Sequence, residues 1–352
     1  PQVVQEIAQK LETKGFEAYL VGGCVRDLLL GREPKDWDVA TNALPEQVQE
    51  IFPDSVYENE FGTVAVKVEE LGVVEVTTYR KEGRYTDKRH PDTIKFAKKI
   101  EDDLARRDFT INAIAEKVMD QGSEIKDSFG GQEDLKNKVI RAVGDADERF
   151  QEDALRLMRA VRLAAELNFG IEKKTADAIK KNAGLLEMIA KARIRDEFTK
   201  LILADKAVDG VRMMTEAGLL KYVVPELLEG VGVGQNKHHI YEVFEHNVRA
   251  LAYAASNNYS LEVRLASLLH DVGKPRTKAG DGSDSTFYNH EVVGAKMTAK
   301  ILDRLHFSKK IVEQVTHLVR WHLFYYNVGE VTEAGVRRFL RKVGPENVDD
   351  LI

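Results

Sequence analysis

The chain has 352 residues, of which 43% are hydrophobic and 31% are charged, and its formal net charge is −6. Because one domain typically holds ~100 to 200 residues, this length predicts at least two hydrophobic cores. The composition is close to ordinary globular usage, which excludes wholesale disorder. The net charge excludes a general electrostatic attraction to nucleic acid, although a local basic patch can still provide one.

The single cysteine, Cys24, excludes an internal disulfide and a zinc cluster built on cysteines, so we expect a reducing, cytoplasmic environment. No apolar run approaches the ~18 residues that cross a bilayer. The first residues also lack the basic and then apolar pattern of a signal peptide. We therefore expect a protein that is neither secreted nor embedded in a membrane.

Hydrophobic periodicity predicts an N-terminal part that mixes strands with helices. Apolar residues at helical spacing predict a helix over residues 3–11, and Pro45 is well placed to begin another. The predicted strands cover residues 16–21, 37–40, 63–68 and 73–80. From about Leu104 the pattern is helical and largely remains so. The expected fold class is α+β, with a head of about 120 to 140 residues followed by a long all-α region.

Two carboxylates and two glycines in this head indicate a site for a metal and a phosphate. Asp36 and Asp38 are two residues apart in a predicted strand, so they share a face and repel each other unless a cation such as Mg²⁺ lies between them. Gly22 and Gly23 let backbone N–H groups approach a polyphosphate, and Arg26 adds a charged donor. Each feature alone is more often structural, but together they resemble a metal-dependent nucleotidyl-transfer site.

The run GGCVRDLLLGREPKDWDVAT resembles the head of the class II tRNA nucleotidyltransferases, which are the CCA-adding enzymes and their poly(A) polymerase relatives in the DNA polymerase β superfamily. The resemblance implies that Glu75 is a third catalytic carboxylate, with an exposed strand glutamate as an equal alternative. It implies that RRDFTINAIA recognises ribose through Arg107, Asp108 and Asn112, and a helix there would present Asp108 and Asn112 on one face. The basic run TYRKEGRYTDKRHP resembles the flexible loop with which these enzymes switch between nucleotides.

A segment predicted as one helix, RFQEDALRLMRAVRLAAEL, carries EDALR, which resembles the base-recognition motif of the same family. The resemblance implies nucleotide binding by Glu152, Asp153, Arg156, Arg159 and Arg162. An ionised Asp153 can only accept and Arg156 can only donate hydrogen bonds, a pair that suits the Watson–Crick edges of C and A and rejects those of U and G. The alternative is a solvated face of Glu–Arg pairs.

The next segment, ARIRDEFTKLIL, resembles a further helical motif of the family. There Arg193, Arg195 and Glu197 would brace the base-reading helix. On the base-reading helix itself, an apolar stripe is expected to be buried and contains Ala154, Met158, Val161 and Ala165.

Histidines are concentrated in the C-terminal third of the chain. His270 and Asp271 are adjacent at a predicted helix end, and His246 and His290 lie in flanking segments. Imidazole and carboxylate groups are common metal ligands, and LLHDVGKP resembles the HD superfamily of metal-dependent phosphohydrolases. His317 and His322 are weaker candidates. The distal aspartate that usually completes such sites has no obvious counterpart, since Asp349 and Asp350 are poorly placed.

These observations lead to the hypothesis of a template-independent CCA tRNA nucleotidyltransferase that uses CTP, ATP and Mg²⁺, binds the tRNA 3′ end and acceptor stem, and holds a further divalent metal in its HD site. The alternatives are an enzyme that adds only the final A, a poly(A) polymerase, or an HD phosphohydrolase. The expected parts are a mixed-sheet nucleotidyltransferase head at 1–140, an all-α neck at 141–205, body helices at 206–235, and an HD-type helical domain at 236–352, with continuation beyond residue 352 left open.

Overall fold

The computed structural model describes residues 1–57, 61–69, 71–83, 85, 92–118, 122–236, 240–280, 282–323 and 332–351. Its packing divides the chain into two compact units. The first comprises Pro1–Arg156 and Phe169–Asn182, and the second comprises Leu157–Asn168 and Ala183–Ile352. The four parts expected from the sequence are finer than this division and stay a prediction.

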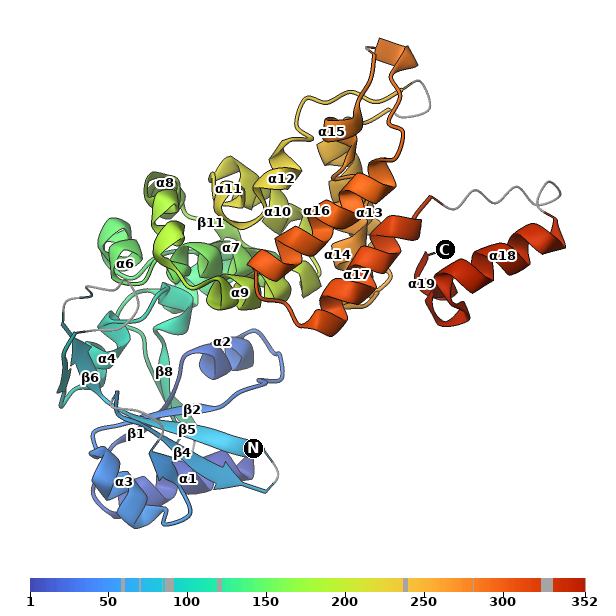
Figure 1. The fold of residues 1–352 in the computed structure, drawn as a ribbon. Helices are drawn as coiled ribbons and strands as arrows, with labels where there is room; N and C mark the ends of the chain where they lie inside the picture. The colour runs from blue at the N-terminus through green and yellow to red at the C-terminus, as the bar shows by residue number, and fades with distance from the viewer. Residues whose placement is uncertain are drawn as a thin grey trace. The chain divides into compact units, whose positions relative to one another are not determined.

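The first unit is built on a mixed seven-stranded sheet with the order β3-β4-β5-β2-β1-β8-β9 (Figure 1). In chain order these strands are β1 (Ala18–Val21), β2 (Asp38–Thr41), β3 (Val56–Tyr57), β4 (Thr63–Val68), β5 (Gly72–Thr78), β8 (Ala115–Val118) and β9 (Ser123–Lys126). Strands β2 and β5 are parallel, and the other neighbours in the sheet are antiparallel. The predicted mixed sheet is therefore confirmed.

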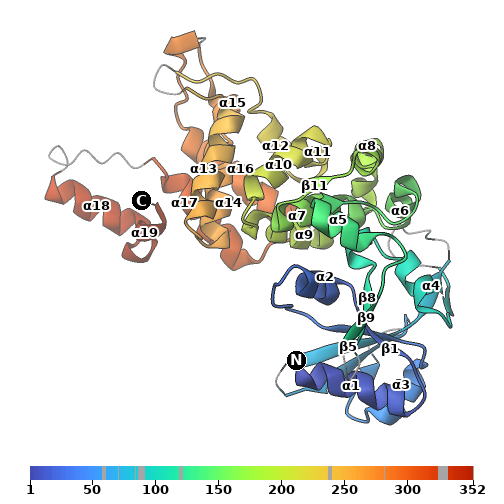
Figure 2. The same ribbon diagram turned by 180° about the vertical axis from the view of Figure 1, so that it is seen from behind.

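Helices cover both faces of this sheet. Figures 1 and 2 show α1 (Gln2–Thr13) and α3 (Pro45–Ile51) on one face and α2 (Gly23–Leu29) on the other. Helix α1 buries Val4, Ile7 and Leu11 along one stripe, as its helical spacing predicts. Because both faces are covered, all four residues of the central strand β1 are buried.

The first unit also contains strands and helices outside this sheet. They are β6 (Arg80–Glu82), β7 (Ile94–Phe96), α4 (Ile100–Ala105), α5 (Gly131–Asn137), β10 (Val139–Ile140), α6 (Ala146–Glu152), β11 (Gly170–Ile171) and α8 (Lys173–Asn182). Strands β6 and β7 form a separate antiparallel pair. Residues 84 and 86–91 of the basic run lie outside the described residues, so the flexible loop expected there stays a prediction.

The second unit is helical. Helix α7 (Leu155–Leu167) enters it from the first unit, and the others are α9 (Lys191–Leu203), α10 (Ala207–Glu216), α11 (Leu220–Val223), α12 (Pro225–Leu228), α13 (Val243–Ser256), α14 (Leu261–Leu269), α15 (Lys274–Thr277), α16 (His290–Arg304), α17 (Lys309–Trp321), α18 (Glu333–Val343) and α19 (Val348–Leu351). Helix α14 packs against α9, α13 and α17, and α16 packs along α17.

Two predictions about these elements were wrong. The chain is not continuously helical after Leu104, because β8 and β9 form a hairpin that pairs with β1. Their sequences AEKV and SEIK lack a strong strand signal, and backbone pairing in the sheet decides their conformation. The segment from Arg149 to Leu167 is also not one helix, since α6 ends at Glu152 and α7 begins at Leu155. The buried stripe of Ala154, Met158, Val161 and Ala165 is confirmed.

Candidate active site and metal centre

The turn from β1 into α2 depends on a glycine. Gly22 has φ +79° and ψ −134°, a conformation that residues with a side chain rarely adopt. A Cβ atom placed on Gly22 would lie 2.8 Å from Nη1 of Arg107 and 3.4 Å from Oδ2 of Asp38. The absence of a side chain therefore lets an arginine and an aspartate, distant in sequence, approach the same point of the backbone.

The predicted carboxylates belong to two parallel neighbouring strands or to the segment just before one of them. Asp38 is the first residue of β2, and its Cα partner on β5 is Glu75. Asp36 lies in a bend before β2, so its predicted position within the strand was wrong. Burial raises the pKa of the Asp38 carboxyl, the charge of Asp36 raises it further, and the Arg107 guanidinium opposes both. Carboxylates in this situation fit a divalent cation, which would offset their repulsion.

The predicted ribose residues meet at a short 3₁₀ turn, Thr110–Asn112, rather than on an α-helix. Nδ2 of Asn112 donates to Oδ1 of Asp108 at 3.1 Å, and the backbone N–H of Phe109 donates to the same oxygen at 2.8 Å. Asp108 and Asn112 are both buried. The tight turn, not helical periodicity, brings these two side chains together.

Arg26 contacts Asn112 and is oriented by Asp27, a residue that the sequence analysis did not identify. Its Nη1 donates to Oδ1 of Asn112 at 2.9 Å, while Nε and Nη2 donate to the two carboxylate oxygens of Asp27 at 2.9 and 3.0 Å. A two-point guanidinium–carboxylate contact fixes the orientation of the arginine. The only signal for Asp27 in the sequence was its place next to Arg26.

Asp153 breaks the base-reading segment into two helices. Its backbone is extended, its Oδ1 accepts from the N–H of Leu155 at 3.0 Å, and its carbonyl accepts from the N–H of Arg156 at 3.0 Å. It therefore caps the start of α7, a frequent role of aspartate. The side chain of Arg156 is buried, and its Nη1 donates to Oε2 of Glu152 at 2.7 Å. The Glu152–Arg156 pair, four residues apart, bridges the break between the helices.

In the second unit, Glu197 braces α7. Its Oε2 accepts from Nε of Arg162 at 2.6 Å, and its Oε1 lies 3.8 Å from Nη1 of Arg159. Arg162 also reaches Glu166, one turn along α7. This confirms the predicted bracing by Glu197. Arg195 was wrongly placed in that network, because its guanidinium donates to Asp196 and to the carbonyl of His306.

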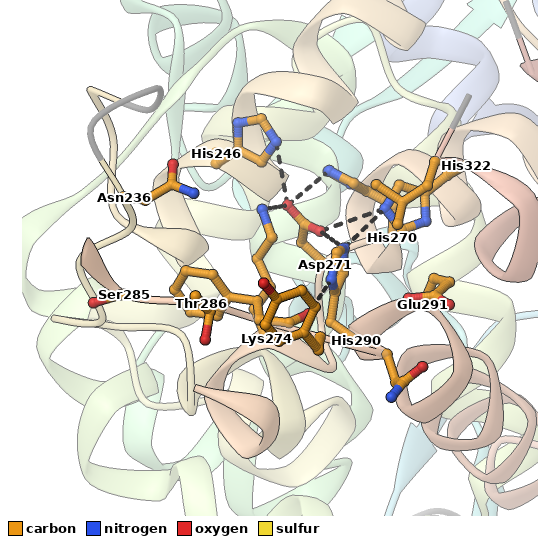
Figure 3. Close-up of a pocket in the computed structure, with 14 residues that line it drawn as sticks. Asn236, His246, His270, Asp271, Lys274, Ser285, Thr286, His290, Glu291 and His322 are labelled. Atoms are coloured by element: carbon orange, nitrogen blue, oxygen red, sulfur yellow. Dashed lines mark hydrogen bonds and ion pairs between the residues drawn. The ribbon is translucent and has the colours of Figure 1, made fainter. Parts of the chain in front are cut away.

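The HD motif forms a cluster in which one carboxylate faces several histidines (Figure 3). Oδ2 of Asp271 lies 3.2 Å from Nε2 of His270 and 3.3 Å from Nε2 of His246, and Oδ1 lies 3.2 Å from Nε2 of His290. His322, a weaker candidate from sequence, joins the cluster with its Nε2 at 3.5 Å from Oδ1 of Asp271. Asp271 is 1% exposed, which makes it the centre of the group.

The tautomers of these histidines favour a bound cation. In His270, His290 and His322, Nδ1 lies 2.7–2.8 Å from the backbone carbonyl three residues earlier. A carbonyl only accepts, so Nδ1 carries the proton and, in the neutral ring, Nε2 presents a lone pair. The Nε2 atoms of His290 and His322 lie 3.3 Å apart, and Oδ1 of Asp271 is buried with no hydrogen-bond partner among the described residues. Lone pairs that converge in this way fit a divalent metal ion.

Lys274 and a close backbone approach complete the surroundings of this cluster. Nζ of Lys274 lies 2.7 Å from Oδ2 of Asp271 and donates to Oε1 of Gln235 at 2.6 Å. A Cβ on Gly273 would lie 2.3 Å from the carbonyl oxygen of His290, so a glycine is required for the HD turn to reach α16. The adjoining cavity has a volume of about 650 Å³ and is lined by polar residues such as Asn236 and Thr286, and by Tyr288.

Three other residues considered for the HD site, His317, Asp349 and Asp350, lie outside this cluster. His317 donates from Nε2 to the carbonyl of Val343 at 2.7 Å. Among the described residues, two sets of side chains could hold a metal ion: His246 with His270 and Asp271, and Asp271 with His290 and His322. Neither Asp349 nor Asp350 belongs to either set.

Burial lowers the pKa of His322. Burial also disfavours the charged forms of His270 and Asp271, but their mutual attraction raises the pKa of His270 and holds that of Asp271 well below its ordinary range.

Three regions of the chain match known protein families. Residues 18–141 match the poly A polymerase head domain, residues 168–230 match the probable RNA and SrmB-binding site of polymerase A, and residues 243–343 match the HD domain. Domains of the first and third kinds generally depend on divalent metal ions. Among the residues with described placement, no helix is both long and apolar enough to span a bilayer.

Individual proteins show the same relationship. The CCA-adding enzyme of Ligilactobacillus salivarius is 48% identical over 217 residues, which is 61% of this chain and 53% of that protein, and that of Lactobacillus helveticus is 52% identical over 196 residues, 55% and 48% respectively. The chain thus spans about half the length of the curated relatives it matches. The crystal structure of the Bacillus stearothermophilus CCA-adding enzyme in complex with CTP matches with a TM-score of 0.72 and 32% identity over 99% of this chain and 76% of that one.

Proposed function

The chain belongs to the family of class II tRNA nucleotidyltransferases and poly(A) polymerases, and from this premise we propose that it adds C, C and A to the 3′ end of tRNA from CTP and ATP. The observation that carries the proposal is the approach of Asp38 and Arg107 to the Gly22 backbone, with Glu75 on the adjoining strand. The relatives named CCA-adding enzymes support the choice of reaction. We propose a cytoplasmic site of action, for which the single cysteine is the support.

Asp36 and Asp38 are the proposed holders of Mg²⁺, with Glu75 as a third catalytic carboxylate. When bound, Mg²⁺ would lower the pKa of the tRNA 3′-hydroxyl and neutralise negative charge on the α-phosphate. The chain places Asp38 at the start of β2 opposite Glu75 in the middle of β5, with Asp36 just before β2. Burial and the charge of Asp36 already make the Asp38 anion costly without a cation. That cost is the physical support for a metal at this position.

The triphosphate is proposed to lie along Gly22 and Gly23 with Arg26 and Arg107. Without side chains, the two glycines let phosphate oxygens come close to the backbone, and the arginines neutralise the departing pyrophosphate. Arg26 is held in advance by Asp27 and Asn112, so little side-chain entropy is lost when the nucleotide binds.

Asp108 is the proposed acceptor for a ribose hydroxyl, and Asn112 the residue that orients it. Asp108 already accepts two hydrogen bonds on Oδ1, from Phe109 and Asn112, so its carboxylate plane is fixed. A deoxynucleotide would leave this oriented carboxylate without its hydroxyl partner, at a cost of about 1–3 kcal/mol. This is the proposed basis for preferring NTP over dNTP.

Base selection is assigned to Asp153 and Arg156, assisted by Glu152. An acceptor beside a donor suits C and A, whereas U and G would place like groups against each other. Capping of α7 by Asp153 and the ion pair of Arg156 with Glu152 keep both side chains in set orientations, which supports their use as a protein template. Arg159 and Arg162 remain proposed nucleotide-binding residues, although the pairing of Arg162 with Glu197 favours a bracing role.

The test is primer extension on three tRNA transcripts that end before CCA, after C and after CC, each with Mg²⁺ and with CTP, ATP or both. Completion of all three to CCA, followed by arrest, supports the proposal. Extension of only the transcript ending in CC, and only by A, would identify an A-adding enzyme. A long A tail without tRNA preference would identify a poly(A) polymerase. Because backbone phosphate contacts would hold the acceptor stem, binding should weaken as salt increases.

A second candidate activity is metal-dependent phosphoester hydrolysis at the HD cluster. It is favoured by the convergence of four histidines on Asp271 beside a polar cavity of about 650 Å³. A divalent metal there would activate water for attack on phosphorus. Asp38→Ala should abolish nucleotide transfer and leave phosphatase activity, whereas Asp271→Ala should do the reverse. A wild-type protein without phosphatase activity on any phosphoester would contradict this second function.

A further inference from the structure

A fully buried carboxylate lies in the head outside the residues assigned so far. Asp103, on helix α4, has a side-chain exposure of 0%. Its Oδ1 accepts from Nε of Arg106 at 2.9 Å, and its Oδ2 accepts from Nη2 of Arg107 at 3.1 Å. Burial acts against the charge of Asp103, but the two guanidinium groups hold its pKa below the ordinary range. One anion therefore fixes two adjacent arginines, each through a different oxygen.

The two arginines lead to different parts of the head. Nη1 of Arg107 lies 2.8 Å from where a Cβ on Gly22 would be, and Oδ2 of Asp38 lies 3.4 Å from the same point. In the opposite direction, Nη1 of Arg106 donates to Oε1 of Glu82 at 3.1 Å. Glu82 is the last residue of β6, so the contact reaches the strand pair from which the basic run begins.

Glu82 is itself surrounded by donors from that run. Nε of Arg80 donates to Oε1 of Glu82 at 2.9 Å, and the hydroxyl of Tyr85 donates to Oε2. The side chains of Arg80 and Glu82 are 14% and 7% exposed, so water screens these contacts little. The result is an unbroken chain of charged contacts from the base of the basic run, through Arg106, Asp103 and Arg107, to the Gly22 turn.

We propose that Asp103 is a positioning residue that holds the Arg107 guanidinium against the Gly22 turn, where the nucleotide triphosphate would meet it, and that ties this arginine through Arg106 to the β6–β7 strand pair. An unrestrained arginine samples many rotamers, whereas one held by a buried anion meets the phosphate in a single geometry. The buried Nε of Arg107 has no hydrogen-bond partner among the described residues. The hydrogen bond from Nη2 to Asp103 is therefore what orients this guanidinium. The inference rests on the proposed nucleotidyl transfer and adds a residue to it.

The test compares Asp103→Asn with Asp102→Asn. Asp102 is the neighbouring residue on α4 and forms a partly exposed ion pair with Lys81, so its variant loses a carboxylate on the same helix without touching Arg107. We expect Asp103→Asn to lower kcat/KM for CTP and ATP by about 10- to 100-fold, the effect of a misplaced substrate-positioning group. The KM for tRNA should change by less than about twofold, and Asp102→Asn should behave like the wild type in each measurement.

A double-mutant cycle with Arg107→Lys separates positioning from a merely structural role. If Asp103 acts through Arg107, then Asp103→Asn lowers kcat/KM much less in the Arg107→Lys background than in the wild type. Independent effects that multiply would overturn the proposal, as would a wild-type KM for nucleotides in Asp103→Asn. If Asp103→Asn yields no folded protein, Asp103→Glu decides, because it keeps the charge and moves the carboxylate by one methylene. A raised nucleotide KM in Asp103→Glu supports the proposal, and an unchanged one overturns it.

Equilibrium binding of CTP to the full chain distinguishes failure of this inference from failure of the proposed function. Weaker CTP binding in Asp103→Asn than in Asp102→Asn supports the role of Asp103 even if the wild type extends no tRNA. Equal CTP binding in the two variants overturns it even if the wild type extends tRNA normally.

Discussion

Replacement of Gly22 by alanine tests the geometry on which the nucleotide site is built. The backbone at Gly22, with φ +79° and ψ −134°, lies in a region that is nearly restricted to glycine, so alanine should cost about 1–3 kcal/mol of folding free energy. The new Cβ would also lie 2.8 Å from Nη1 of Arg107 and 3.4 Å from Oδ2 of Asp38. The arginine must therefore move, although Asp103 holds its other nitrogen. A displacement of about 1 Å at such a group lowers activity by about 100-fold.

Gly15→Ala is the matched control, because Gly15 also has a positive φ, +86°, but a Cβ there would meet nothing within 4 Å. Both variants should lose folding free energy in urea unfolding, by about 1–2 kcal/mol for Gly15→Ala. Only Gly22→Ala should lose primer extension by about 100-fold at a temperature where both are folded. Equal specific activities of the two variants would refute the argument that Gly22 makes room for Arg107 and Asp38.

Three other predictions concern stability and metal binding. Arg264 is 4% exposed and donates to four backbone carbonyls, so Arg264→Met should cost about 2–4 kcal/mol in urea unfolding, and a loss below about 0.5 kcal/mol would contradict this. In an Asp38→Ala background, which removes the proposed metal site of the head, a divalent cation such as Mn²⁺ at about 100 times its Kd should stabilise the protein by about 2.7 kcal/mol against urea unfolding. Adding Asp271→Ala should abolish this stabilisation, whereas its retention, or its loss on adding His317→Ala instead, would exclude the HD cluster as its cause. Folding lowers the pKa of Asp103, so its contribution to stability is present above the ordinary aspartate pKa of ~3.9 and is lost as the pH falls through the lower folded value. Asp103→Asn should therefore lose less unfolding free energy than the wild type between about pH 5 and pH 2. Plots of unfolding free energy against pH that run parallel for variant and wild type would contradict this.

Several features of the site could be predicted from local sequence because local physics determines them. Helix α1 follows from apolar spacing, α3 from Pro45, and the strand–turn–helix around Gly22 from the Gly-Gly pair after an apolar run. The pairing of Asp38 with Glu75 agrees with the expected carboxylate on a neighbouring strand. In each case the signal lies within one element or one turn, where steric and hydrophobic preferences act over a few residues.

Residues joined by tertiary packing could not be predicted in the same way. His322 looked like an isolated helical histidine, and it meets Asp271 because α17 packs along α16 and against α14. At Asp153 the backbone could continue the first helix or the side chain could cap the next one, and the cap forms. The hydrophobic periodicity of the segment does not distinguish these two outcomes.

The sequence by itself determined several strands and helices of the head up to β5, the identity of its acidic and basic groups, and the HD motif, because these depend on local periodicity and on residue type. Only the tertiary structure decided that β8 and β9 are strands, that Arg107 reaches the Gly22 turn, and that Asp103 holds it. The physical reason is that a backbone hydrogen bond to β1, or a buried ion pair such as Asp103–Arg107, gains its strength from burial. Burial exists only after the chain has folded around these groups.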